Sequence, residues 1–306
     1  MSAKKKPELL VTAKDLDEVQ RLFDSGADAL HIGGKEYGLR MPGHFTLEMI
    51  GEATKIAHQN QKKIYVLMNA LFHNEMLVGL EEYIQRLAQF EVDGIVFGDP
   101  AVLMIAKKVA PQIALHWNTE TTSTNYQTVN YWAKKGATRA ILARELSLQE
   151  VIDIKQHVDI EVQVQVHGMT CIFHSKRGLV SSYLDFTGQE QKDTSQDRGL
   201  FLREHKRPNE QYPVFEDLHG THIMSAEDIC MIDHIGKLID AEIDSLKIEG
   251  ILKSTNYLEK VVQHYRTAID QYVTGNKVTV SSKDIEAIQP KNRPLGTGFY
   301  FKEQYY

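Results

Sequence analysis

The side chains best suited to chemistry gather around one of the only two cysteines in this chain of 306 residues. Cys171 follows an apolar, strand-like run within the stretch VHGMTCIFHSKRGLVSS, residues 166–182. Its neighbours in sequence are cationic or titratable: His167, His174, Lys176 and Arg177. Cationic surroundings favour the thiolate, which is the form of cysteine that attacks electrophiles and binds metals. The stretch therefore indicates a nucleophile, a metal ligand, or the remains of a site that once held more ligands.

Polar side chains also stand where apolar, strand-like runs end: Asn69, Asp99, Glu120, Glu145, His167 and Glu249. The sequences ARE and KIE place a cation close to an acid, Arg144 beside Glu145 and Lys247 two residues before Glu249. Alternate residues of a strand face the same side, so Lys247 and Glu249 can point into one pocket. We expect Arg144, Glu145, His167, Lys247 and Glu249 to form a pocket for an anionic small molecule. Ion pairs that merely close one end of the fold are the alternative.

These side chains need a scaffold that brings strand ends together. Short β-branched runs alternate regularly with longer amphipathic stretches. The predicted strands are 8–13, 28–34, 62–71, 93–99, 113–120, 139–145, 160–168 and 245–250. The predicted helices are 15–26, 45–60, 77–90, 100–110, 125–136, 147–158 and 254–275. Continuous apolar runs separated by helices are typical of buried parallel strands joined by right-handed crossovers.

This order predicts an α/β protein, and we favour a (β/α)8 TIM-like barrel over a doubly wound open sheet. The polar residues collect at one end of the strands, where barrels build their sites. The connection between the seventh and eighth strands is too long for an ordinary barrel loop. We therefore expect a barrel over residues 1–275 that includes a long loop insertion at 169–224, followed by a short β-rich extension at 276–306.

The insertion adds cations near Cys171 to a chain whose formal net charge is −6. An acidic protein does not bind nucleic acid through its whole surface, but a local basic patch indicates an anionic partner such as RNA or a phosphorylated metabolite. An ordinary solvated charge run is the alternative. Phe201 and Tyr212 are candidates to stack on an unpaired base. The predicted RNA contacts are Arg177, Arg198, Arg203, Lys206 and Arg207.

Composition narrows the class of protein. Apolar residues make up 42% of the chain and charged residues 25%, as in soluble globular proteins. The first residues lack an apolar stretch of signal-peptide length, and no window approaches the length of a membrane span. Two distant cysteines without an export signal indicate reduced thiols rather than a disulfide. We expect a cytoplasmic protein with no membrane partner.

The motifs VHGMTC, ARELSL, SLKIEG and NRPLGTGFYF give the chain its resemblance to a known family. In their order and separations they resemble the peptidase U-32 family, once described as collagenase-like proteases. The resemblance covers nearly the whole chain. Several members of that family resemble oxygen-independent hydroxylation factors that act on tRNA wobble uridine, ribosomal RNA or ubiquinone precursors. These members often carry a [4Fe–4S] cluster, and some work as pairs of homologous subunits.

The chain departs from the family pattern at the cluster ligands. The resemblance implies that Cys171 and Cys230 stand at the first and fourth cysteine positions, whereas Gly178 and Phe201 stand at the second and third. A cubane cluster needs about four thiolates. We therefore predict that Cys171 and Cys230 are the remnant of a cluster site and that this chain holds no cofactor. A cluster completed by histidines, or a mononuclear zinc site, is the alternative.

The resemblance implies a subunit of a tRNA wobble-uridine hydroxylation system that makes 5-hydroxyuridine. Its partner would be a cysteine-complete homologue carrying the [4Fe–4S] cluster, in a hetero- or homo-oligomer, with prephenate as a candidate hydroxyl donor. Whether the chain is itself an RNA-modifying enzyme or a non-catalytic subunit stays open. A peptidase is one alternative, since Cys171 and His167 supply the residue types of a thiol nucleophile and its base. A barrel enzyme acting on a small anionic metabolite is another.

Overall fold

Eight parallel strands form a closed ring in the structure, a computed structural model that describes residues 4–118, 123–189, 193–276, 278 and 280–302. The strands are β1 (Glu8–Thr12), β2 (Ala29–Ile32), β3 (Lys63–Met68), β4 (Gly94–Phe97), β5 (Ala114–Asn118), β6 (Arg139–Ile141), β7 (Glu161–Gly168) and β13 (Ser245–Ile248). Each pairs in parallel with the next, and β13 pairs with both β7 and β1, which closes the ring. The prediction of a (β/α)8 barrel is confirmed, and the open sheet is excluded.

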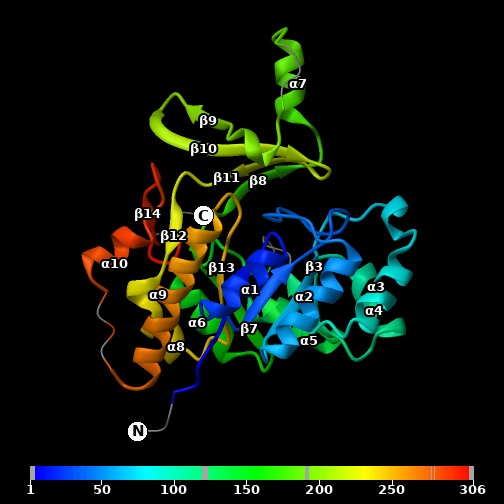
Figure 1. The fold of residues 1–306 in the computed structure, drawn as a ribbon, viewed down its shortest axis with the longest axis vertical. Helices are drawn as coiled ribbons and strands as arrows, with labels where there is room; N and C mark the ends of the chain where they lie inside the picture. The colour runs from blue at the N-terminus through cyan, green and yellow to red at the C-terminus, as the bar shows by residue number, and fades with distance from the viewer. Residues whose placement is uncertain (1–3, 119–122, 190–192, 277, 279, 303–306) are drawn as a thin grey trace.

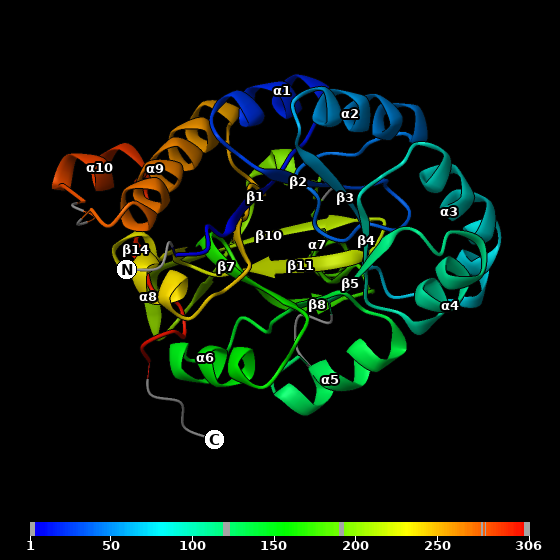
Figure 2. The same cartoon turned by 90° about the horizontal axis from the view of Figure 1, so that it is seen from below.

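Helices return the chain between the strands and surround the ring (Figure 2). They are α1 (Leu16–Asp24), α2 (Leu47–Gln59), α3 (Leu80–Gln89), α4 (Pro100–Val109), α5 (Tyr126–Lys135), α6 (Leu148–Gln156), α8 (Ile235–Asp240) and α9 (Thr255–Val273). Polar caps fix several starts: the side chains of Asp15, Thr46 and Asn125 accept backbone amide hydrogens from the first turn. Among the described residues, none of the helices combines the length and apolar character that a membrane span requires.

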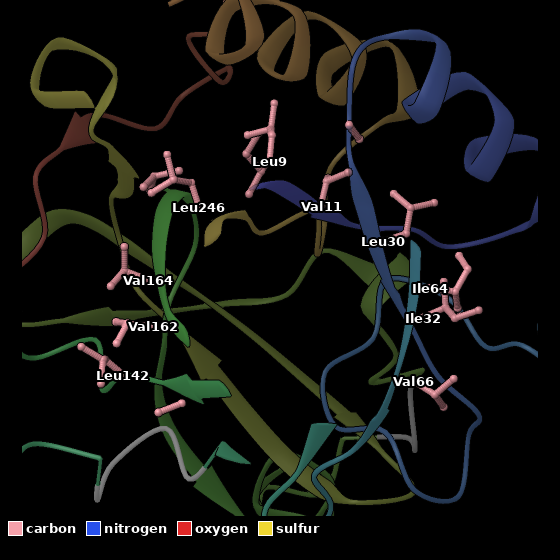
Figure 3. Close-up of a cluster of buried hydrophobic side chains, with 14 of the residues drawn as sticks. Leu9, Val11, Leu30, Ile32, Ile64, Val66, Leu142, Val162, Val164 and Leu246 are labelled. Carbon is pink, nitrogen blue, oxygen red and sulfur yellow. The ribbon is translucent and has the colours of Figure 1, made fainter. Parts of the chain in front are cut away.

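Side chains on the strands alternate between two apolar cores. On β1, Leu9 and Val11 point outward to the helices, whereas Leu10 points into the ring. Figure 3 shows the outward set, to which Val164 and Leu246 also belong. Strands buried on both faces explain why the sequence shows continuous apolar runs. The cluster inside the ring consists of Leu10, Ala29, Met41, Tyr65, Leu67, Val96 and Ile141.

A buried ionic network fills the amino-terminal end of the barrel. The Arg139 side chain is 2% exposed and lies 2.6 Å from the Glu8 carboxylate and 2.7 Å from that of Glu161. The hydroxyls of Tyr65 and Ser245 donate further hydrogen bonds to Glu8. These residues come from five different strands, so the network ties the ring together. The open space of the barrel consequently lies at its carboxyl end.

The connection expected as a long loop instead folds as a second, antiparallel sheet. Its strands pair in the order β8-β11-β10-β9, and we call them the roof sheet because they lie across the carboxyl end of the barrel (Figures 1 and 2). Helix α7 (Leu179–Phe186) projects from this sheet, away from the barrel (Figure 1). The strands are β8 (Cys171–Ser175), β9 (Phe201–Glu204), β10 (Arg207–Asp217) and β11 (Gly220–Met224).

A small apolar cluster explains why this segment is ordered as a sheet. Phe215 and Met224 of the roof sheet pack against Met169 and Ile251 of the barrel rim. The chain leaves and re-enters the barrel at neighbouring points, where the Ser225 amide donates to the Thr170 carbonyl at 2.7 Å. The roof sheet therefore sits on the rim as a unit of its own.

The segment after α9 packs beside the barrel. Strand β14 (Leu295–Gly296) pairs with β12 (Asp228–Cys230), which itself runs antiparallel to the end of β7. Among the described residues of the expected β-rich extension, β14 is a short strand, whereas Ser281 and Asp284 form a capping box that starts the longer helix α10 (Ser282–Ala287). Three short 3-10 turns complete the structure: η1 (Asn74–Leu77), η2 (Gln196–Arg198) and η3 (Ile232–His234).

Candidate functional site

A charged pair stands inside the mouth of the barrel. The Nζ of Lys247 lies 2.8 Å from Oε2 of Glu249, and both side chains line an inner cavity of about 40 Å³. The other carboxylate oxygen, Oε1, accepts hydrogen bonds from the Thr12 hydroxyl at 3.1 Å and the Ile251 amide at 3.2 Å. Both oxygens of Glu249 are therefore engaged, and the pair is held in one place at the mouth.

A larger cavity of about 440 Å³ lies between the barrel rim and the roof sheet. Arg40, Asn69, Asn118 and Arg144 line this outer cavity and the inner one, so the two spaces are continuous. Pockets of a few hundred Å³ are typical of sites for small molecules. The roof sheet closes the space from above with Cys171, Ile172, Phe173 and His174.

The charges around the inner cavity favour an anion. Arg40, Arg144 and Lys247 bring three cations to it, against the single carboxylate of Glu249 among the described lining residues. Glu145 lines the outer cavity only, where it is exposed. Arginine and lysine bind carboxylates and phosphates through charge-assisted hydrogen bonds. Among the described lining residues, cations thus outnumber carboxylates in the inner cavity, whereas Asp99 and Glu145 balance Arg40 and Arg144 in the outer one.

The remaining strand-end residues differ in position and in hydrogen bonding. Asp99 borders the outer cavity and caps α4, since its side chain accepts the Ala101 amide at 2.8 Å. The Asn69 side chain accepts the Leu39 amide at 3.0 Å, which fixes the loop after β2 against the mouth. Glu120 lies outside the described residues. Each of the two described side chains thus supports local structure in addition to lining the cavity.

The expectation that His167 faces the mouth is wrong. The pairing of β7 with β13 shifts register between Gln165↔Lys247 and His167↔Ile248, which is a β-bulge. Paired residues share a face of a sheet, and Ile248 belongs to the outer core, so His167 also points outward. Its Nε2 lies 2.8 Å from the Tyr257 hydroxyl on α9. Complete burial lowers the pKa of His167 to about 3, so the ring is neutral.

Sequence reasoning missed two residues of the mouth. Asn118 ends β5 as Asn69 follows β3, and this parallel was a usable signal. Arg40 lies in the loop after β2, is largely buried and has a φ of 53°, a left-handed conformation uncommon for residues other than glycine. Nothing in the periodicity of the sequence marks a buried arginine in a loop. Its placement follows from the tertiary structure alone.

The two cysteines occupy different surroundings. Cys171 lies on β8 beside the outer cavity, and its thiol donates to the Phe173 carbonyl at 3.1 Å. Cys230 lies on β12, with its sulfur 3.9 Å from the Tyr265 hydroxyl, and burial raises the pKa of its thiol. Within the described ranges, no three His, Cys, Asp or Glu side chains converge as metal ligands. These donors do not fit a four-thiolate cluster.

The predicted RNA contacts are all exposed parts of the insertion. Arg207 begins β10 and is largely neutralised, because its guanidinium lies 3.0 Å from the Glu204 carboxylate and 3.5 Å from that of Glu210. The guanidinium of Arg203 sits 5.0 Å from the ring centroid of Phe201. Lys206 lies in the turn between β9 and β10, Arg198 ends η2, and Arg177 precedes α7.

The family model described as Peptidase family U32 matches residues 14–306. The chain is 48% identical over 309 residues to tRNA hydroxylation protein P2 of Bacillus subtilis (strain 168), covering 99% of this chain and 100% of that protein. It is 35% identical to tRNA hydroxylation protein P1 of the same organism, covering 97% of this chain and 71% of the relative.

A solved structure shows the same fold. The structure of the U32 peptidase Mk0906 aligns with a TM-score of 0.50 at 16% identity, covering 81% of this chain and 94% of that one. Because the two sequences are only 16% identical, this likeness supports the fold alone. The family match, by contrast, spans nearly every residue of the chain. The resemblance seen in the motifs is confirmed, and the chain belongs to peptidase family U32.

Proposed function

We propose that this protein is a subunit of a system that hydroxylates the wobble uridine of tRNA to 5-hydroxyuridine. The observation that carries the proposal is the 48% identity, over essentially the full length of both chains, to a relative named for tRNA hydroxylation. A protein that acts on tRNA would work in the cytoplasm, where tRNA resides. The exposed cations of the insertion would contribute to holding the RNA.

The chain would act with a cysteine-complete homologue. It has two cysteines, whereas a cubane cluster takes about four thiolates, so the cluster would belong to the partner. Helix α7 supports such pairing, because none of its residues is buried and it exposes 61% of Tyr183 and 90% of Phe186. Exposed apolar groups on a projecting element are typical of contact surfaces between proteins.

The barrel mouth would bind the anionic co-substrate, for which prephenate, with its two carboxylates, is the candidate hydroxyl donor. Arg40, Arg144 and Lys247 would contribute the positive charge that attracts a carboxylate there. A peptidase is less well supported, because His167 points away from Cys171 toward α9 and does not form the expected base. The inner cavity, whose described lining has more cations than carboxylates, also suits an enzyme of small anionic metabolites, which is the second candidate function.

The test is the 5-hydroxyuridine content of bulk tRNA, measured by mass spectrometry in cells that lack the gene. We expect the modified nucleoside to disappear and to return with the wild-type gene. Lys247→Met should restore at most a few per cent, since losing a charge-assisted contact costs about 2 kcal/mol or more, and Lys247→Arg should restore more. The matched control Lys134→Met changes an exposed lysine of α5 and should restore the full level. Unchanged 5-hydroxyuridine in the deletion strain would reject the function.

A further inference from the structure

A second cavity system lies beneath the roof sheet, beside the start of α9. Two adjoining cavities of about 630 Å³ each share Met169, Leu252, Lys253, Ser254, Lys291 and Arg293, and so form one groove. One wall comes from the roof sheet and η2, and the other from α9 and the C-terminal segment. The groove shares Met169 with the inner cavity of the mouth but is otherwise lined by different residues.

The groove concentrates positive charge on an acidic protein. The chain has a formal net charge of −6, yet the cations lining the groove outnumber the two carboxylates there, Asp197 and Glu286. Lys260 and Lys291 are exposed and have no ion pair within the part of the chain that the structure describes. The lining cations are Lys14, Lys253, Lys260, Lys291 and Arg293.

A buried triad gives the groove a fixed positive wall. The carboxylate of Asp228 is fully buried, and its Oδ1 accepts from Arg293 at 2.9 Å through Nε and at 2.8 Å through Nη2. Its Oδ2 accepts from the ammonium of Lys253. One carboxylate thus faces two cations whose side chains are 5% and 13% exposed. The triad keeps one positive charge without a counter-charge. Because such a charge is costly to bury, an anion entering the groove would be stabilised.

The backbone adds to this field. Helix α9 has 19 residues and begins at the groove, where Ser254 caps it. The first turn of a helix carries partial positive charge and unpaired amide groups, both of which favour phosphate. Lys260 lies further along the same helix and also lines the groove. The helix start reinforces the cations that already stand there.

An aromatic ring also lines the groove. Phe201 of β9 is 44% exposed, and Arg203 lies against its ring. By its resemblance to the family pattern, Phe201 replaces a cysteine of the cluster site. An exposed ring beside a positively charged track is the combination used to bind single-stranded RNA, in which bases stack and phosphates pair with cations.

We propose that this groove binds the phosphate backbone of RNA, with Phe201 stacking on an unpaired base; the identity of the RNA as tRNA rests on the proposed function. Two cavities in series, each bearing several cations, suit a polymer with repeated phosphates better than a single phosphate group. A free phosphorylated metabolite would offer the same chemistry at one point only. The proposal assigns the main RNA contact to the groove, and a secondary contact to Arg203 of β9, which lies against Phe201, and to Lys206 in the turn that follows β9.

The test is binding of an unmodified tRNA transcript to the full chain, followed by fluorescence anisotropy over a range of salt concentrations. Lys260→Gln with Lys291→Gln should weaken binding. It should also make the negative slope of log K against log salt shallower by about 1.5, the counterion release expected for two phosphate contacts. The matched control Lys55→Gln with Lys134→Gln removes the same charge from exposed positions of α2 and α5 and should bind as wild type. Phe201→Ala should weaken binding with the salt slope unchanged, because stacking releases no counterions.

Several results would overturn the proposal. One is tRNA binding by the groove variant that equals the control, and another is a wild-type chain that does not bind tRNA. A third is a groove variant that loses binding of inorganic phosphate or a nucleoside monophosphate but binds tRNA as the wild type does. That result would assign the groove to a metabolite. Failure of the proposed function is distinct, because it would appear as unchanged 5-hydroxyuridine in the deletion strain while RNA binding by the groove persists.

Discussion

Three buried histidines make the stability of this protein sensitive to acid. His31 and His116 lie inside the barrel and His167 lies outside it, and burial holds all three pKa values well below the ordinary value for histidine. In the unfolded chain each ring takes up a proton below about pH 6.5, whereas in the folded protein it stays neutral. The unfolded state therefore binds more protons as the pH falls, and stability is lost between about pH 6.5 and the depressed pKa values.

This gives a prediction for His167. Urea unfolding at about pH 7 and about pH 5 should show a loss of up to about 1.4 kcal/mol per pH unit for each such histidine. His167→Gln should lose less stability than wild type over the same interval, although it starts from a lower value because the contact with Tyr257 is altered. Equal losses in the two proteins would contradict the assignment of a neutral, buried His167.

The same residue shows why part of the site was beyond sequence reasoning. Strict alternation along β7 predicts that His167 shares a face with Gln163 and Gln165, and it fails because one extra residue enters the strand at the bulge. Lys247 and Glu249 were predictable, since β13 alternates without interruption to its end. A one-residue irregularity leaves no mark in a hydrophobic pattern but reverses every side chain beyond it.

At the scale of elements, α7 carries the prediction that bears on assembly. Replacing Tyr183 and Phe186 by serine should reduce copurification with the cysteine-complete homologue at least several-fold, because it removes the apolar surface that the partner would bury. The fold should survive, since neither side chain is buried. Pull-down of the coexpressed homologue measures this.

The barrel supplies a matched control for α7. Met104 on α4 and Tyr131 on α5 are also large, apolar and exposed, by 68% and 54%, and their replacement by serine should leave copurification unchanged. Equal retention of the partner by both double variants would remove α7 from the interface. A loss of thermal stability in the α7 variant would show instead that the helix supports the roof sheet.

Elements differed in how well the sequence predicted them. The barrel was predictable because most units repeat a buried strand, a polar cap and an amphipathic helix, as in β6, Ser147 and α6. The roof sheet was not, because β9 is exposed along its whole length and β10 lacks a regular alternation of buried and exposed residues, so their period-two pattern is weak. The apolar residues that anchor it, Phe215 and Met224, pack against Met169 and Ile251, and only the fold brings these together.

For the whole molecule, the cysteine count predicts its metal content. Purified anaerobically by itself, the protein should carry no stoichiometric iron or sulfide and should lack visible absorbance, since it offers two thiols where a cubane takes about four. Iron should appear when the cysteine-complete homologue is copurified. Iron and sulfide bound to the chain alone would contradict this prediction and point to histidine ligands.

Thr170 and Ser225 mark the points where the chain leaves the barrel and returns to it. Because the chain exits and re-enters the barrel through one pair of hydrogen-bonded neighbours, the ring does not register how many residues lie between them. Lengthening, replacing or losing the intervening segment would disturb the small cluster on the rim but none of the eight paired strands. The segment that covers the mouth can therefore differ in length or sequence without any change in the pairing of the barrel strands.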